Sequence, residues 1–207
     1  MKNRYKKTLS VLKKSDMIMS YFANDRVILS NGHVLFEFRP NIYREYIGGT
    51  HDGLPALTDN LVNNGYVWDK VRKSDGLKPA DNEILKNYVN DYLDRADLFV
   101  DPVSPMMFDL GSNKLVRTIV YNDGGCARGV MISDNYYQAL REFMTVSDKV
   151  YHSNYKSPVV AVASDDVRAL VLPINPGKES EFNHILDTLT AEAEMKRQKT
   201  EKKFRVV

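Results

Sequence analysis

The sequence predicts an α+β protein in which two segments, each a helix followed by three strands, form an antiparallel sheet with helices on one side. Residues 157–174 hold two apolar runs separated by an Asp/Ser cluster, which is the pattern of a strand pair. A helix and one further strand are predicted just before this pair. The same order, a helix and then three strands, is predicted at the N-terminus. This internal repetition is the main basis for the fold prediction.

Residues 4–14 predict an amphipathic helix with its lysines largely outside the apolar stripe. That stripe consists of Tyr5, Thr8, Leu9, Val11 and Leu12. Strands are predicted at 17–23, 26–29 and 33–38, separated by turns at residues 24–25 and 30–32. Asn31-Gly32 between two apolar runs predicts a type I′ hairpin turn, because that turn needs positive φ at both central residues.

Residues 40–97 differ in character and are predicted to be a helical insertion or long connection, with a small helical subdomain as the alternative. Repeated glycines punctuate this segment, a short helix is predicted over 54–62, and a stronger one over 81–94. Its aromatic residues include Tyr43, Tyr46, Tyr66 and Trp68. A stacking platform for nucleic-acid bases is one interpretation of these rings, and packing in a core is the favoured one.

The second half of the chain is predicted to repeat the helix-plus-three-strand order. Strands are expected at 98–103, 115–121 and 126–132, and a helix follows from Ser133, a good N-cap residue with Asp134 in the first turn. A strand at 149–153 precedes the hairpin of 157–174. The last segment, 177–207, predicts a helix that fades into a basic tail, and the whole chain 1–207 is expected to form one domain.

Composition favours an ordinary globular protein of the cytoplasm without enzymatic activity. The chain has 207 residues, a net charge of +2 and no apolar run of the length that a membrane span needs. Its single cysteine, Cys126, fits a reducing compartment and has no sequence-adjacent base to activate it. The four histidines show no HxH or HxxxH spacing, so neither a metal site nor a cofactor is expected. An enzyme built from dispersed residues stays open as a third hypothesis.

Positive charge is concentrated at the two ends of the chain. The candidate DNA-binding residues are Lys2, Arg4, Lys6, Lys7, Lys13 and Lys14 of the N-terminal segment, and Arg141 of the second helix. Lys and Arg side chains that neutralise phosphates release counterions, which gives affinity that is independent of sequence and sensitive to salt. The alternative is a solvated helix face without a nucleic-acid partner.

The two repeated segments can be aligned, with Tyr5 on Tyr137 and Ser15-Asp16 on Ser147-Asp148. The run 28–35 (ILSNGHVL) looks like the T-D-G-(H/Y)-x-L hairpin of clamp domains, with Asn31 where Asp is usual. The run 168–174 (RALVLPI) looks like the terminal strand of bacterial clamps. Over residues 4–39 and 115–176 the chain therefore resembles one domain of the DNA sliding clamps, the bacterial β clamp and its archaeal and eukaryotic relatives.

The clamp resemblance implies a function as well as a fold. Clamp domains turn their helices toward double-stranded DNA and form rings of six domains, so a chain of this length would have to form a homo-oligomer to encircle DNA. The resemblance also implies a groove for a peptide of a replication protein, here at Leu170, Leu172, Pro173 and Ile174. The expected function is a DNA-associated scaffold or processivity-type factor of phage or mobile-element origin. The alternative is a protein-interaction or inhibitor module that binds no nucleic acid and uses the Tyr-rich segment as its surface.

Overall fold

The computed structural model describes residues 4–71, 76–82, 84–86, 88, 99–100, 106–109, 115–123, 126–143, 149–152, 159–164, 166–174, 188, 191 and 195. Two groups of predictions therefore lie outside the described residues. One is most of the C-terminal segment 177–207, and the other is Lys2 with most of the helix expected over 81–94.

The described helices and strands are those of an α+β protein, as predicted. The helices are α1 (Lys6–Lys14), α2 (Pro40–Tyr46), the 3-10 turn η1 (Asp59–Leu61) and α4 (Asp134–Arg141). The first strands are β1 (Met17–Phe22), β2 (Val27–Ser30), β3 (Val34–Phe38), β4 (Asn64–Asp69), β5 (Lys78–Pro79) and β6 (Phe99–Val100). They are followed by β7 (Met106–Asp109), β8 (Leu115–Asp123), β9 (Cys126–Ser133), β10 (Lys149–His152), β11 (Val159–Ser164) and β12 (Val167–Val171).

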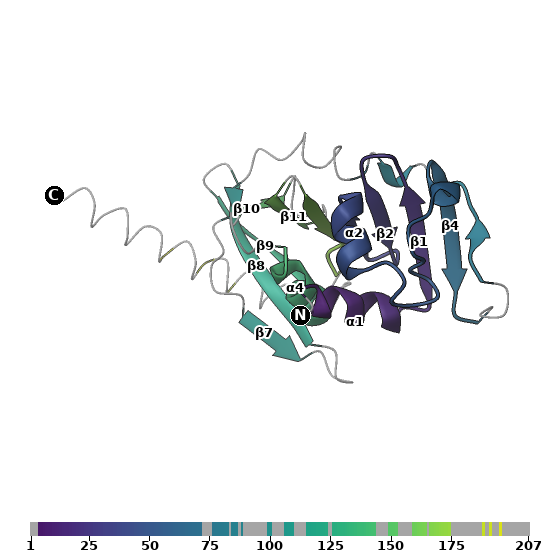
Figure 1. Ribbon diagram of the computed structural model, residues 1–207. Coiled ribbons are helices and arrows are strands. Elements are labelled where there is room, and N and C mark those ends of the chain that lie inside the picture. Colours follow the sequence, from purple (N-terminus) through teal and green to yellow (C-terminus); the bar gives the residue numbers. More distant parts are fainter. Residues whose placement is uncertain are drawn as a thin grey trace.

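Nine of the described strands form one sheet in the order β5-β4-β1-β2-β3-β12-β11-β10-β6, with every pair antiparallel. The strand triplets β1–β3 and β10–β12 meet where β3 pairs with β12, with Phe36 opposite Ala169 and Leu35 opposite Leu170. A second sheet, β7-β8-β9, stands beside α4 at one end of the molecule (Figure 1). The antiparallel sheet is as predicted, whereas the separate three-stranded sheet was not foreseen.

α1, α2 and α4 cover the same face of the main sheet (Figure 1). Alternate residues of each strand point to that face, so Phe22, Leu29, Phe36 and Ala169 share a single core with the helices. The opposite face has its own smaller cluster, in which Leu85 packs near Tyr21, Ile28, Leu35 and Leu170. α1, α2 and α4 thus lie on one side of the sheet, whereas Leu85, whose backbone is also helical, packs against the other side.

The segment expected to be an insertion contributes to the main sheet. β4 pairs with β1 along its whole length, from Met17 opposite Asp69 to Phe22 opposite Asn64. The close approach of the next segment requires a glycine in β4, because a Cβ on Gly65 would lie 2.4 Å from the carbonyl oxygen of Ala80. Residues 64–69 of this segment therefore extend the main sheet next to β1.

Two local predictions were wrong. Over 54–62 the described backbone has only the short turn η1, because Pro55 disfavours helical backbone at the residue before it. The turn after β2 is not type I′, since Gly32 has a positive φ of 85° but Asn31 does not. The Asn31 side chain closes the turn instead, because its Oδ1 accepts the backbone N–H groups of His33 and Val34, each at 3.0 Å.

Tyr43 of α2 is fully buried, and its hydroxyl donates a hydrogen bond of 2.7 Å to the carbonyl oxygen of Pro55. Burial raises the pKa of the Tyr43 phenol far above its ordinary value of 10.0. The folded protein thus keeps a proton that the unfolded chain loses above about pH 10.

We expect the ionisation of Tyr43 to add no pH dependence to the stability below about pH 9.5. Above about pH 10 the stability should fall, by up to about 1.4 kcal/mol per pH unit from this phenol. Urea unfolding between about pH 9 and 11 measures the fall. Tyr43→Phe should start from lower stability at neutral pH and lose less of it on going to alkaline pH. An identical alkaline slope in the two proteins would contradict this explanation.

Candidate nucleic-acid interface

The outer face of α1 carries the strongest concentration of exposed cations in the described structure. Thr8, Leu9, Val11 and Leu12 are buried and form one stripe of the helix. Lys6, Lys7, Lys13 and Lys14 are all exposed. With 3.6 residues per turn, these four lysines fall on the side of the helix opposite the buried stripe. Within the described residues none of the four forms an ion pair.

Two other candidate cations flank this face. Arg4 is exposed, with its guanidinium 5.6 Å from the centre of the Tyr5 ring. Arg141 is exposed in the last turn of α4. α1 and α4 pack against each other, and we call these two helices the helical layer. Arg141 therefore belongs to the same layer as the lysines of α1. Six of the seven predicted DNA-binding residues are thus described, and all six are exposed.

Glu142, the residue after α4, caps the N-terminus of α1. Its carboxylate accepts the backbone N–H groups of Lys7 at 2.6 Å and Thr8 at 2.8 Å, and also the Thr8 hydroxyl at 2.8 Å. The first N–H groups of a helix have no partner inside the helix, and an anion at this end is stabilised by the helix dipole. The cap therefore ties the two helices together across 134 residues of sequence.

We expect Glu142→Ala to destabilise the protein by about 2 kcal/mol, because two backbone N–H groups and a buried hydroxyl lose a charged acceptor. Glu142→Gln keeps one acceptor oxygen and should lose about half as much. Thermal or urea unfolding of the three proteins gives the comparison. If the alanine variant were as stable as the wild type, the cap would have no energetic role.

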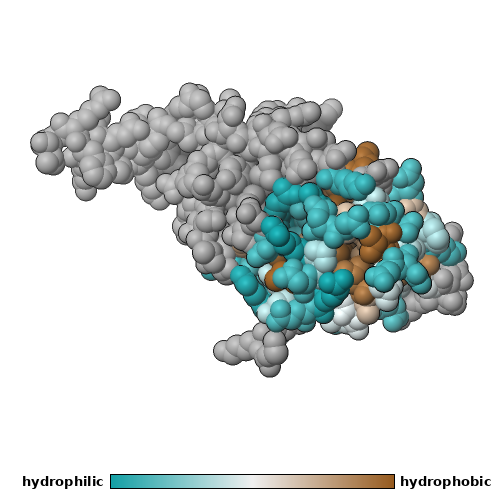
Figure 2. Space-filling view, turned by 45° about the horizontal axis from the view of Figure 1, so that its top comes forward, coloured by the Kyte–Doolittle hydropathy of each residue, from teal (hydrophilic) through white to brown (hydrophobic). Residues whose placement is uncertain are grey.

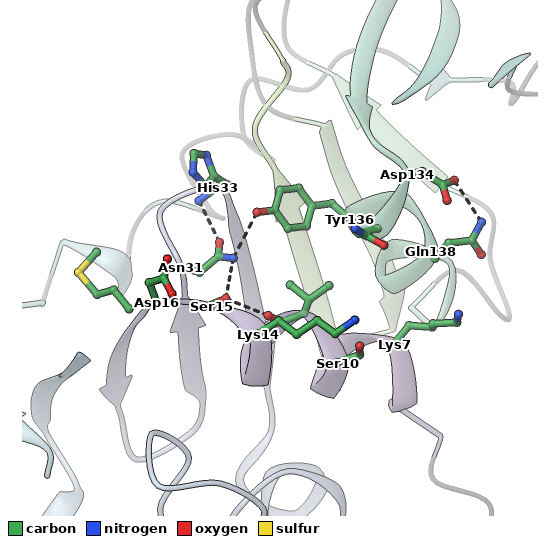
Figure 3. Close-up of a pocket in the computed structure, with 13 residues that line it drawn as sticks. Lys7, Ser10, Lys14, Ser15, Asp16, Asn31, His33, Asp134, Tyr136 and Gln138 are labelled. Atoms are coloured by element: carbon green, nitrogen blue, oxygen red, sulfur yellow. Dashed lines mark hydrogen bonds between the residues drawn. The ribbon is translucent and has the colours of Figure 1, made fainter. Parts of the chain in front are cut away.

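A polar groove of about 510 Å³ runs between α1, the start of α4 and the turn after β2 (Figure 3). Lys7, Ser10 and Lys14 line one side of it, and Tyr136 and Gln138 line the other. Three further residues, Ser15, Asn31 and His33, line the end of the groove beside the β2–β3 turn. None of the groove residues on the α4 side was predicted from the sequence to bind a ligand.

Asn31 holds this end of the groove together. Its Nδ2 donates to the Ser15 hydroxyl at 3.0 Å and to the Tyr136 hydroxyl at 3.4 Å. Ser15 in turn donates to the carbonyl oxygen of Val11 at 2.9 Å, and the His33 ring stacks near Tyr136 with centroids 6.2 Å apart. One side chain thereby links the end of α1, the β2–β3 turn and α4.

The acidic residues around the groove have partners elsewhere. Asp134 pairs with Arg117, and Asp16 pairs with Lys70 at 3.3 Å. Glu142, beyond the groove, is occupied by the N-terminus of α1. The lysines on the same surface have no ion-pair partner among the described residues. The helical layer therefore carries excess positive charge, although the whole chain is nearly neutral.

Of the four predicted partner-binding residues, two line a groove and two do not. Leu170 and Leu172 line a mainly apolar groove of about 270 Å³ together with Ile84, Leu85 and Tyr88. Ile84 is 67% exposed and Leu172 is 38% exposed, so the groove opens to solvent. Pro173 and Ile174 are half-buried and do not line it, and the backbone N–H of Ile174 donates to the carbonyl oxygen of Met131 at 2.7 Å. Hydrophobic residues also gather on the described surface in Figure 2, where hydrophilic residues surround them.

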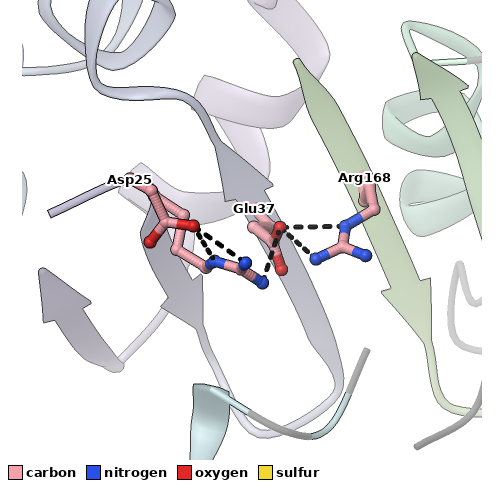
Figure 4. A network of polar contacts seen from close by, with 4 residues as sticks. Asp25, Glu37 and Arg168 are labelled. Carbon is pink, nitrogen blue, oxygen red and sulfur yellow. Dashed lines mark hydrogen bonds and ion pairs between the residues drawn. The ribbon is translucent and has the colours of Figure 1, made fainter. Parts of the chain in front are cut away.

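A cluster of charged side chains around the buried Glu37 lies on the sheet (Figure 4). The Arg168 guanidinium donates to Glu37 Oε1 from Nε at 2.8 Å and from Nη2 at 2.5 Å across the β3–β12 pair. Arg26 lies 3.6 Å from the same oxygen and bonds Asp25 at 2.9 Å, which lowers the pKa of the Asp25 carboxyl. The cluster joins the β1–β2 turn to β3 and β12, and none of its residues belongs to α1 or α4.

The four aromatic rings considered for base stacking, those of Tyr43, Tyr46, Tyr66 and Trp68, do not form a platform. Tyr43 and Trp68 are buried in the core, and Tyr46 and Tyr66 pack partly against it. Core packing, the favoured interpretation of these rings, is thus confirmed, and the Tyr-rich surface of the alternative hypothesis lacks two of its members. Among the described residues, no group of three His, Cys, Asp or Glu side chains could hold a metal ion, and no helix has the length and apolarity to cross a membrane.

No protein-family model matches this sequence, and no curated protein matches it.

Proposed function

We propose that this protein is a clamp-like, non-enzymatic DNA-associated scaffold whose helical layer contacts the phosphates of double-stranded DNA. The observation that carries the proposal is the outer face of α1, where four exposed lysines have no ion-pair partner among the described residues. Such a face provides sequence-independent, salt-sensitive attraction for a polyanion.

The arrangement of the elements supports the clamp-like part of the proposal. α1 precedes β1–β3 and α4 precedes β10–β12, the two triplets pair through β3 and β12, and the two helices lie against each other on one face of the sheet (Figure 1). A clamp domain would turn this helical face toward DNA. Encircling a duplex would require several copies of a chain of this length.

The apolar groove lined by Leu172 and Ile84 supports a second part of the proposal, the docking of a peptide from a replication protein. Exposed apolar residues at the rim of a groove fit a short amphipathic peptide. Pro173 and Ile174 are expected to position this rim through their backbone and not to contact the peptide. The alternative, a protein-interaction module that binds no DNA, would use the same groove, and the lysines of α1 would then have no part in binding.

The test is binding to a fluorescent duplex of about 30 base pairs at low salt, with the oligomeric state measured by light scattering on the same sample. We expect binding by the wild type, and an affinity about a hundredfold lower when Lys6, Lys7, Lys13 and Lys14 are all replaced by alanine. Unfolding curves of the two proteins should coincide, since the four side chains are exposed. No binding by the wild type would refute the DNA-associated function and favour the protein-interaction module.

A further inference from the structure

We propose that the groove between α1 and α4 is a phosphate-binding site that seats one phosphodiester group of a DNA strand. This inference rests on the proposed function and makes it more specific, because it selects Lys7 and Lys14 from the four lysines of α1. Both line the groove, whereas Lys6 and Lys13 do not. The groove of about 510 Å³ falls within the size range of ligand pockets, so it can hold a phosphate with part of its sugars.

The side chains along the groove are hydrogen-bond donors of the kind that phosphate oxygens accept. Lys7, Ser10 and Lys14 occupy successive turns along one edge of α1, and Figure 3 shows the two lysines on either side of Ser10. Neither Ser10 nor the two lysines has a side-chain partner within the described part of the chain. Hydroxyl and ammonium groups at this spacing can share one phosphate between them.

The wall of the groove formed by α4 adds neutral hydrogen-bond donors, and its one carboxylate, Asp134, already has an ion-pair partner. Asn135 and Gln138 of α4 bring amide groups to the groove, and the Gln138 amide has only a long contact of 3.4 Å to Asp134. Asp134 itself is held by Arg117, and Asp16 at the other end by Lys70. An anion entering the groove thus meets two free ammonium groups and carboxylates that already have partners.

The walls of the groove are fixed before any ligand arrives. Glu142 ties α4 to the first turn of α1, and Asn31 ties the end of α1 to Tyr136. The donors on the two helices therefore need no rearrangement to face one another, which lowers the entropic cost of binding.

The decisive experiment compares two double variants of the full chain that remove equal charge, Lys7→Ala with Lys14→Ala and Lys6→Ala with Lys13→Ala. Both proteins are titrated with fluorescent duplex DNA and with a fluorescent oligothymidylate. We expect about a tenfold or larger loss of affinity for the groove pair and about a twofold to threefold loss for the outer pair. Equal losses would overturn the groove site and leave the DNA-associated function standing.

A second measurement separates a DNA phosphodiester from free phosphate as the ligand. Amide and side-chain NMR signals of Gln138 and Tyr136 are followed while the dinucleotide TpT, or inorganic phosphate, is added. We expect shifts with TpT that disappear in the groove pair and persist in the outer pair. Shifts with inorganic phosphate alone, or with neither ligand, would overturn the phosphodiester site. TpT shifts in a wild type that binds no duplex would retain the site and reject the proposed function.

Discussion

Replacing Phe143 by alanine is expected to lower the free energy of unfolding by about 3–5 kcal/mol. Phe143 is fully buried, and its ring centroid lies 5.3 Å from that of Phe36, 5.5 Å from Tyr5 and 5.6 Å from Phe38. Tyr5 is the N-cap residue of α1, and Phe36 and Phe38 lie in β3, so this ring, just after α4, joins the ends of both helices to the sheet. Its removal deletes several aromatic contacts and leaves a cavity at their centre.

Urea unfolding of Phe143→Ala measures this effect, with Phe143→Leu and Val71→Ala as controls. The leucine variant retains much of the volume and should lose about half as much stability. Val71 is 90% exposed, so its replacement should change stability by less than about 0.5 kcal/mol. A loss of under 1 kcal/mol for Phe143→Ala would contradict the packing of α4 described above.

Replacing Arg168 by methionine is expected to destabilise the protein by about 3 kcal/mol. The Glu37 side chain is only 8% exposed and receives two hydrogen bonds from Arg168, while its Oε2 has no hydrogen-bond partner among the described residues. Without Arg168 the buried carboxylate would keep only Arg26, at 3.6 Å. A buried charge that loses its partner is costly, and the apolar replacement cannot solvate it.

The double variant with Glu37→Met and Arg168→Met separates this cost from lost packing. Removing both charges leaves no buried ion, so its stability should return to within about 1 kcal/mol of the wild type. Arg26 keeps its bond to Asp25 in that variant. If the double variant were less stable than Arg168→Met, the loss would come from packing between β3 and β12, and the ion-pair explanation would be wrong.

Local patterns predicted the strands and the first helix because neighbouring residues determine them. The apolar stripe of residues 5–12 and the runs at 17–23, 26–29 and 33–38 correspond to α1 and β1–β3. The pairing of β4 with β1 was missed because its strand pattern is short and surrounded by Asn and Gly, which also signal turns. Turn residues alone could not show that the β2–β3 turn has a positive φ at Gly32 only and is closed by the Asn31 side chain.

The candidate site was predictable only on the α1 side. Four lysines opposite a buried stripe are visible in nine residues of sequence. The opposite wall, with Tyr136 and Gln138, depends on contacts between helices more than 100 residues apart, and the sequence offers no partner for either side chain. The Glu142 cap on α1 and the Glu37–Arg168 pair were not predicted for the same reason, since each joins residues more than 100 positions apart in the sequence. An acid inside an apolar strand, as at Glu37, was the one available sign of a buried ion pair.

The most direct test of the proposed function is the salt dependence of duplex binding by the wild type and by the variant with alanine at Lys6, Lys7, Lys13 and Lys14. Each lost phosphate contact should reduce the slope of log K against log salt by about 0.9. We therefore expect the slope to be smaller by about 3.6 in the variant, which loses four such contacts. Equal slopes in the two proteins would contradict phosphate contact by α1, and with it the assignment of the helical layer as the DNA-facing surface.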